Sequence, residues 1–339
     1  MMRLPWFKYR APRSVVEAAR ILAAEGREAM LIAGGTDLLP NMKRRQQTPA
    51  TLVSLRQVET LKSVAAGKSL TLGAGLTLSE VVDTPMVRDG YRGLWQAAAQ
   101  VASPHLRNMG TLGGNLCLDT RCLYYNQNED WRRAIDYCLK RDGETCWVAT
   151  ASKRCLAVSS TDTAPALISL GARVRLVSAA GERDIALHDL YRNDGIDYLA
   201  RQHDEILTEV ALPNAEGWKS TYWKLRRRGA FDFPVLGVAA AVRTAADGTV
   251  EDARIVLGAV SSRPLLTEAG QLLVGGQLTD EAIAAAGKKA ASAAKPMDNT
   301  DLDLYWRKNV VAVFVAYALK EIRGDDMAAT RMRVARQGL

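Results

Sequence analysis

Four of the five cysteines of the chain occur between residues 122 and 155. They are Cys122, Cys138, Cys146 and Cys155. The segment around them is rich in Arg, Asp, Asn and Tyr and has no sustained alternation of apolar residues. Irregular segments of this length are uncommon inside compact domains unless something anchors them. Because clustered thiolates can hold an iron–sulfur cluster, the sequence predicts a loop that folds around a metal centre.

The cysteine spacing, C-x15-C-x7-C-x8-C, contains no C-x2-C pair and so matches neither a zinc ribbon nor a ferredoxin signature. A four-cysteine zinc site and four free buried thiols remain open as alternatives. A disulfide framework is not expected, because the cysteine count is odd and the N-terminal sequence MMRLPWFKYRAPRS lacks the apolar core of a signal peptide. We therefore expect a cytoplasmic protein.

Composition argues against two classes of partner. The formal net charge is +8, but the basic residues are scattered, whereas a nucleic-acid site would need a dense basic stripe. The most apolar late stretch, Val310–Leu319, is too short to cross a membrane. With 339 residues, of which 48% are hydrophobic and 24% charged, the chain has the make-up of a globular protein of two or three domains.

Helices and strands alternate in the first half of the chain. Ser14 and Glu17 have capping-box spacing at the start of a helix that Gly26 ends. A short strand follows at residues 30–33 and is broken by Gly34 and Gly35. Further strands are predicted at 51–55 and 69–73, and helices at 78–82 and 95–102.

The last third of the chain predicts a separate layer of strands followed by helices. Strands are expected there at 222–226, 235–242 and 253–260, and helices at 281–294 and 306–322. Before this layer, apolar periodicity occurs at 164–176 and a strand is expected at 205–212. The predicted parts are residues 1–60, residues 61–215 with the cysteine insert at about 118–157, residues 216–325, and a tail at 326–339.

Two glycine-rich loops follow predicted secondary structure, at Ala33–Asp37 and at Asn108–Asn115. Glycines allow a ligand to approach the main chain, and exposed amides favour an anion such as a pyrophosphate. Neither loop fits G-x-G-x-x-G, so a Rossmann site is not indicated. Together the loops favour a phosphate-bearing cofactor.

Four motifs occur in a recognisable order: AGGTD at 33–37, RNMGTLGGN at 107–115, SSTDTAPAL at 159–167 and KLRRR-x-x-FD at 224–232. In this order they resemble the FAD-binding (medium) subunit of the molybdenum hydroxylase, or xanthine oxidase, family. The resemblance covers nearly the whole chain. It implies an α+β fold: a two-part FAD-binding domain that carries the cysteine insert, followed by a C-terminal α+β domain.

The resemblance also implies the residues that bind FAD. The first loop is formed by Leu31, Ile32, Ala33, Gly34, Gly35, Thr36, Asp37 and Leu38. The second loop is formed by Thr111, Leu112, Gly113, Gly114 and Asn115. Val101 is expected to pack against the cofactor rings, Asp162 to accept a hydrogen bond from a cofactor hydroxyl, and Lys224 to lie near the isoalloxazine.

The cysteine insert departs from the usual family pattern, in which few residues separate the GGN loop from Asp162. It resembles the β subunits of 4-hydroxybenzoyl-CoA reductases, which carry an additional [4Fe–4S] cluster. The implied ligands are Cys122, Cys138, Cys146 and Cys155. Cys117 is interpreted as core filler in a flavin-binding strand, and a cluster held by Cys117 in place of Cys122 stays an alternative.

Function follows from this resemblance. It implies an electron-transfer subunit with a molybdopterin-containing large subunit and a small [2Fe–2S] subunit, assembled as (αβγ)2. Electrons would enter from ferredoxin and pass through [4Fe–4S], FAD and the [2Fe–2S] centres to molybdenum. There the hydroxyl of 4-hydroxybenzoyl-CoA would be removed reductively. No catalytic triad or carboxylate pair is apparent in this chain. The alternatives are the FAD subunit of another molybdenum hydroxylase (aromatic, CO or purine dehydrogenase), a stand-alone flavoprotein reductase, and a scaffold.

Overall fold

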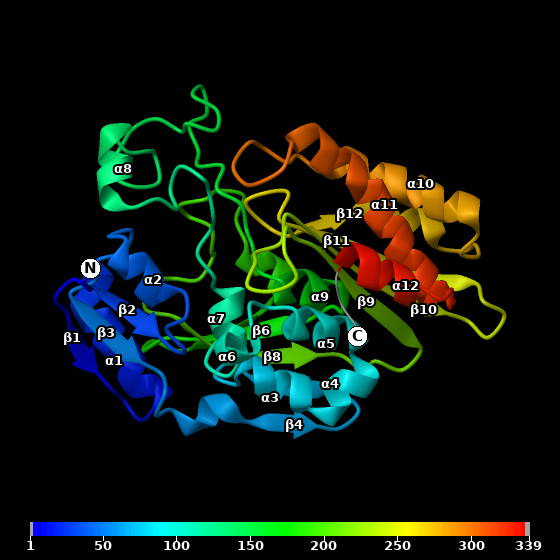
Figure 1. The fold of residues 1–339 in the computed structure, drawn as a ribbon. Coiled ribbons are helices and arrows are strands. Elements are labelled where there is room, and N and C mark those ends of the chain that lie inside the picture. Colours follow the sequence, from blue (N-terminus) through cyan, green and yellow to red (C-terminus); the bar gives the residue numbers. More distant parts are fainter. Residues whose placement is uncertain (1–2, 336–339) are drawn as a thin grey trace.

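The computed structural model describes residues 3–335, and within them the strands form three sheets (Figure 1). The first sheet is parallel, in the order β1 (Lys8–Arg10), β3 (Thr51–Ser54), β2 (Ala29–Ile32). Helix α1 (Val15–Glu25) packs on this sheet, and α2 (Leu38–Lys43) follows the first glycine loop. The predicted strand–glycine turn–helix order is confirmed.

The start of α1 is capped differently from the prediction. Ser14 Oγ accepts a hydrogen bond from the Glu17 N–H at 3.1 Å, as expected. The Glu17 carboxylate, however, accepts from the Arg13 N–H at 3.0 Å rather than from Ser14. The capping box is therefore only half formed here, and the complete one, Thr77 with Glu80, begins α3 (Leu78–Asp83).

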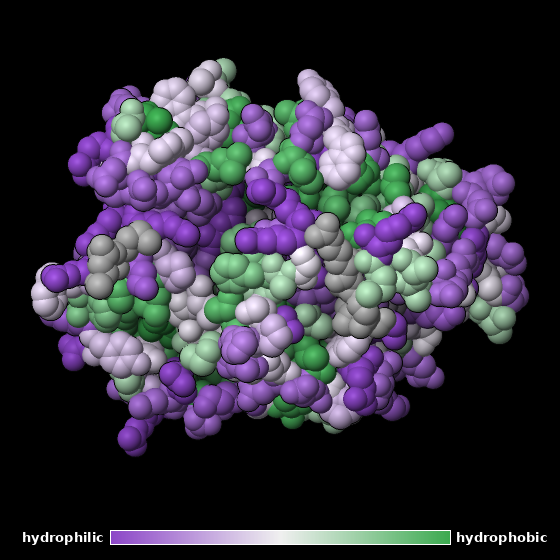
Figure 2. Space-filling view, in the orientation of Figure 1, coloured by the Kyte–Doolittle hydropathy of each residue, from purple (hydrophilic) through white to green (hydrophobic). Residues whose placement is uncertain are grey.

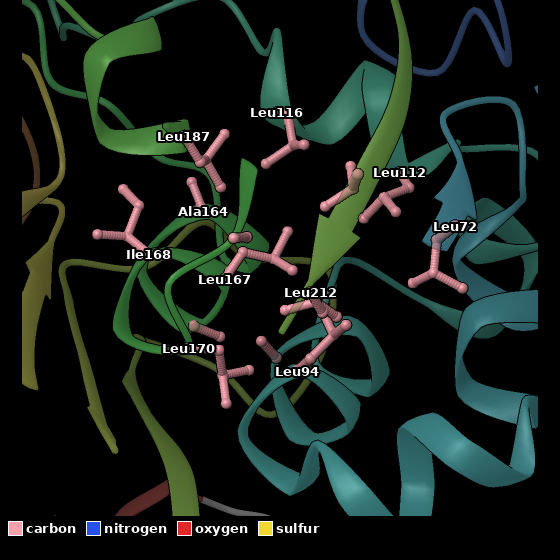
Figure 3. Close-up of a cluster of buried hydrophobic side chains, with 14 of the residues drawn as sticks. Leu72, Leu94, Leu112, Leu116, Ala164, Leu167, Ile168, Leu170, Leu187 and Leu212 are labelled. Atoms are coloured by element: carbon pink, nitrogen blue, oxygen red, sulfur yellow. The ribbon is translucent and has the colours of Figure 1, made fainter. Parts of the chain in front are cut away.

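The second sheet is antiparallel, in the order β4-β5-β8-β6-β7. Its strands are β4 (Val64–Ala66), β5 (Leu70–Gly73), β8 (Ile206–Leu212), β6 (Arg173–Val177) and β7 (Glu182–Ala186). Around it lie α4 (Pro85–Gly90), α5 (Arg92–Ala99), α6 (Pro104–Arg107), α7 (Leu112–Leu116) and α9 (Thr163–Ser169). Leucines from α5, α7, α9 and the strands meet in one buried cluster (Figure 3).

The third sheet is antiparallel, in the order β12 (Leu265–Thr267), β11 (Val250–Gly258), β10 (Leu236–Thr244), β9 (Trp218–Leu225). Two helices, α10 (Asp280–Ala293) and α11 (Leu304–Arg323), pack on it and share its apolar core. A short helix, α12 (Ala328–Thr330), follows. The predicted α+β architecture is confirmed. The strands that were not predicted as such are β1, β4, β6, β7 and β12, each of three to five residues.

The cysteine insert leaves the fold after α7 and returns before α9 (Figure 1). Its ends are joined by two backbone hydrogen bonds between Arg121 and Val158. Inside it, α8 (Glu129–Ala134) begins at Asn128, whose side chain accepts from the Trp131 N–H. Within residues 3–335 no helix is both long and apolar enough to span a membrane.

Candidate functional site

Both glycine-rich loops line a cavity of about 770 Å³, here called the main cavity. The N-terminal sheet supplies one wall through β2 and α2, and the α5–α7 region supplies the other. Figure 2 shows hydrophilic residues gathered along the indentation between the lobe with α8 and the lobe with α1 and α2. A cavity of this size is in the range of cofactor pockets.

The two loops pack directly on each other. A Cβ added to Gly34 would overlap the carbonyl oxygen of Met109 in the second loop, so only glycine fits there. A Cβ on Gly110 would in turn lie 3.3 Å from Thr36 Oγ1. Gly35 has a φ of +71°, in the left-handed region that favours glycine. Gly34 therefore serves contact between the loops, and its missing side chain does not make room for a ligand.

Asn115 ties the second loop to the third motif. Its Oδ1 accepts hydrogen bonds from Thr161 Oγ1 at 2.8 Å, Thr163 Oγ1 at 2.7 Å and the Thr163 N–H at 3.2 Å. On the other side of the loop, Thr111 Oγ1 accepts from the Gly114 N–H at 3.1 Å. Motifs far apart in the sequence are thus brought to one wall of the main cavity.

Asp162 lines the main cavity and is held from behind by two side chains. Tyr222 OH donates to its Oδ1 at 2.8 Å, and Lys224 Nζ donates to its Oδ2 at 2.9 Å. Asp162 is 3% exposed and Lys224 is fully buried. Burial raises the pKa of Asp162 and lowers that of Lys224, and the opposite charge of each partner acts against that shift.

Most of the residues predicted to bind FAD line the main cavity. These are residues 31–38, Val101, Thr111, Gly113, Gly114, Asn115 and Asp162. Leu112 does not, because its side chain is buried in the leucine core (Figure 3). Lys224 is not part of the lining either, and its ammonium lies behind Asp162. Cys117 ends α7 rather than lying in a strand, and it lines the cavity.

Several residues that line the main cavity could not be identified from the sequence, because their spacing matches no motif. They include Arg44, Arg56, Asp119, Arg121, Tyr198, Arg201 and Phe233. Arg121 forms an ion pair with Asp37 of the first loop, and its guanidinium lies 4.7 Å from the ring centre of Phe233. Burial lowers the pKa of Arg121 to about 10. Arg121 directly precedes Cys122, so the cysteine insert is attached to the cavity wall at its first residues.

A second, smaller hollow lies inside the insert and is here called the cysteine hollow. It is lined by Cys122, Cys138, Cys146 and Cys155 together with Tyr124, Tyr125, Leu139, Lys140, Trp147, Val148 and Ala157. The structure thus brings the four predicted thiols together and leaves Cys117 at the main cavity. The hollow is narrow, about 10 Å³, which is close to the least that holds one water molecule.

The four thiols are free, and each cysteine is between 5% and 8% exposed. Burial raises the pKa of Cys122 to about 11 and that of Cys155 to about 12. One backbone N–H nonetheless points at a sulfur, since Ala157 donates to Cys155 Sγ at 3.4 Å. Such amide hydrogen bonds are one means by which proteins stabilise iron-bound thiolates.

Across the described part of the chain, no three or more His, Cys, Asp or Glu side chains are arranged to hold one metal ion. Sulfurs bound to a single zinc ion stand within about 4.6 Å of one another, twice a Zn–S bond of about 2.3 Å. The thiols of the hollow therefore do not form the four-cysteine zinc site that the sequence left open.

Comparison with known families decides the class of protein. Residues 5–215 match the family described as FAD binding domain in molybdopterin dehydrogenase. Residues 220–322 match the CO dehydrogenase flavoprotein C-terminal domain. The chain belongs to the FAD-binding subunits of the molybdenum hydroxylase family. The recognised family and the FAD cofactor are thereby confirmed.

Relatives within the family act in different enzymes. The chain is 31% identical to the aldehyde oxidoreductase FAD-binding subunit PaoB of Escherichia coli, over 91% of this chain and 96% of that one. It is 28% identical to the nicotinate dehydrogenase FAD-subunit of Eubacterium barkeri, over 82% and 83%. It is 27% identical to the carbon monoxide dehydrogenase medium chain of Hydrogenophaga pseudoflava, over 93% and 96%.

Solved structures agree with this assignment. A chain of the Cu,Mo-CO dehydrogenase in its cyanide-inactivated form superposes with a TM-score of 0.79 at 25% identity, covering 95% of this chain and 99% of that one. A chain of the carbon monoxide dehydrogenase from Hydrogenophaga pseudoflava gives a TM-score of 0.77 at 26% identity, over 94% and 98%. The fold is thus that of a family flavoprotein subunit.

Proposed function

We propose that this chain carries FAD in the main cavity and a [4Fe–4S] cluster in the cysteine hollow, and that it passes electrons within a larger enzyme. One observation carries the proposal: four buried, unpaired thiols line one hollow next to the cavity. In a [4Fe–4S] cluster each thiolate binds a different iron, so the ligands stand farther apart than those of one ion. The absence of a single-ion arrangement is compatible with such a cluster.

The residues of the main cavity fit FAD. The amides of the first glycine-rich loop and the nearby Arg121 offer donors and positive charge for a diphosphate. In the second loop, the amides of Gly110 and of residues 112–115 already donate within the protein, so this loop shapes the cavity wall. The carboxylate of Asp162, kept in place by Tyr222 and Lys224, can accept a hydrogen bond from a cofactor hydroxyl. When bound, FAD supplies one- and two-electron transfer, and these residues bind and orient it.

Because of the cysteine insert, we propose that the larger enzyme is a 4-hydroxybenzoyl-CoA reductase. The chain would receive electrons from a low-potential donor such as ferredoxin and pass them to a [2Fe–2S] subunit and a molybdopterin subunit, in an (αβγ)2 assembly of the cytoplasm. There, two electrons and two protons convert 4-hydroxybenzoyl-CoA to benzoyl-CoA and water.

A second candidate is the FAD subunit of an aldehyde oxidoreductase. It is favoured by the 31% identity to the PaoB subunit, which extends over 91% of this chain. In that enzyme class electrons would flow outward, from an oxidised substrate to an acceptor. The two candidates share the cofactors proposed for this chain and differ in the substrate of the partner subunit and in the direction of electron flow.

The native complex, purified without oxygen, separates these functions. We expect copurifying molybdenum and [2Fe–2S] subunits, and formation of benzoyl-CoA from 4-hydroxybenzoyl-CoA with reduced ferredoxin. Oxidation of aldehydes without that activity would support the second candidate instead. A chain that purifies alone and reduces an acceptor by itself would overturn both and leave a stand-alone flavoprotein reductase.

A further inference from the structure

A buried ion pair stands in the wall between the two sites. Asp119 lines the main cavity, and Lys140 lines the cysteine hollow. Lys140 Nζ lies 2.7 Å from Asp119 Oδ1, and the two side chains are 6% and 5% exposed. Each charge therefore faces one of the two proposed redox centres and is shielded from solvent.

The position of the ammonium is fixed from several sides. Lys140 Nζ also donates to Thr120 Oγ1 at 2.5 Å and to the Thr120 carbonyl at 3.1 Å. It lies 4.5 Å from the ring centre of Tyr125, which lines the hollow, and 5.5 Å from that of Tyr198, which lines the main cavity. A lysine side chain is flexible, so holding it here with this many contacts gives its charge a defined place.

The carboxylate is equally well fixed. Tyr125 OH donates to Asp119 Oδ2 at 3.0 Å, and Gln47 Nε2, from the side of the main cavity, lies 3.4 Å from the same oxygen. The pair is thus oriented, with its positive end toward the thiols and its negative end toward the main cavity. Removing either partner would leave the other charge buried without compensation.

We propose that Lys140 is a positioning residue that raises the reduction potential of the cluster in the hollow, and that Asp119 opposes it. The inference rests on the proposed function, because it requires the cluster. On taking one electron the cluster gains one negative charge, which a nearby buried cation stabilises and a nearby carboxylate destabilises. Solvent ions screen such buried charges weakly. The orientation of the pair thus helps a low-potential cluster accept an electron from its donor.

The test is the midpoint potential of the [4Fe–4S] cluster in the holoenzyme, measured by a redox titration followed by electron paramagnetic resonance. Lys140→Gln removes the charge and keeps a hydrogen-bond donor for Asp119. Asp119→Asn removes the opposing charge. The matched control is Lys153→Gln, because Lys153 is exposed and lies two residues from Cys155, as Lys140 lies two residues from Cys138.

We expect Lys140→Gln to disfavour reduction about tenfold, which for a one-electron couple is a fall of about 59 mV. Asp119→Asn should shift the potential upward, while Lys140→Arg and Lys153→Gln should leave it near that of the wild type. A general loosening of the insert would not shift the midpoint potentials of the two charge variants in opposite directions. If Lys140→Gln fails to retain the cluster, the upward shift in Asp119→Asn is the deciding result.

The experiment distinguishes failure of the proposed function from failure of the role proposed for the ion pair. If the wild-type holoenzyme shows no [4Fe–4S] signal, the proposed function itself is wrong. If the signal is present but the charge variants shift its potential in the same direction, or leave it unchanged, only the role assigned to Lys140 and Asp119 is overturned.

Discussion

The main cavity and the cysteine hollow share a wall but are held together by different contacts. Residues of all four motifs line the cavity, and the second and third motifs are anchored in helices above a large apolar core. One continuous segment forms the hollow, and its buried apolar cluster consists of only Cys122, Tyr125, Cys138, Cys155 and Ala157. We infer that the fold sets the shape of the cavity, whereas the hollow would be stabilised by the cluster proposed for it.

The largest expected effect is on the hollow. Cys138→Ser should remove the iron and sulfide of the proposed cluster, because a four-iron cluster needs all of its thiolates. Flavin content should stay near that of the wild type, since the thiol does not line the main cavity. Iron, sulfide and flavin per chain are measured together in the purified holoenzyme.

Cys117→Ser is the matched control, because Cys117 lines the main cavity and is absent from the hollow. It should retain its full iron content. Loss of iron in Cys117→Ser, together with retention in a Cys122→Ser variant, would instead support the ligand set in which Cys117 replaces Cys122.

The next effect is on the wall of the main cavity. Asp162→Ala would leave the buried Lys224 without its counter-charge, although Nζ still donates to the Gln100 carbonyl, and breaking a buried ion pair typically costs about 3–5 kcal/mol of folding free energy. Denaturant unfolding and flavin content measure the change. Asp162→Asn, which keeps a partner for Tyr222, should cost less, and equal losses in the two variants would argue against the charge pair.

A smaller effect is expected where the two loops meet. Gly34→Ala places a methyl group against the Met109 carbonyl, and overpacking of this kind costs about 1–3 kcal/mol. The loops should separate and flavin affinity should fall, as measured by titration of the apoprotein with FAD. Gly67→Ala, which has nothing within 4 Å of its new methyl group, is the control. Unchanged affinity in Gly34→Ala would contradict the packing role.

The smallest effect concerns the shared wall. Tyr125→Phe removes one hydrogen bond to Asp119 and keeps the ring beside Lys140, so it should cost about 1 kcal/mol. Its effect on thermal unfolding should be slight and its flavin content normal. A complete loss of the cluster in Tyr125→Phe would contradict this expectation, because it would show that the hollow requires the tyrosine hydroxyl.

Much of the fold could be predicted from local pattern. The apolar pattern located the long elements: α11 buries one face in a large core, and β10 is a continuous apolar run that is buried on both faces. The short strands β1 and β4 were missed, since three exposed residues give no alternation to detect. Gly34 was predicted as a ligand-facing residue, but its packing against Met109 depends on a loop far away in the sequence.

The candidate site was predictable where a motif carried it. The glycine loops and Asp162 line the main cavity as expected, and the four thiols share one hollow. The Asp119–Lys140 ion pair could not be predicted from the sequence, because its two residues are brought together only when the insert folds back on itself. Lys224 was expected at the cofactor, but its contact with Asp162 could be known only from the arrangement of β9 and α9.

The most direct test of the central claim is the iron content of the holoenzyme, isolated without oxygen, compared between the wild type and Cys138→Ser. The account predicts a difference of about four iron atoms per chain, with an equal flavin content in both proteins. An identical iron content in the two proteins would show that the hollow holds no cluster, and would contradict the account.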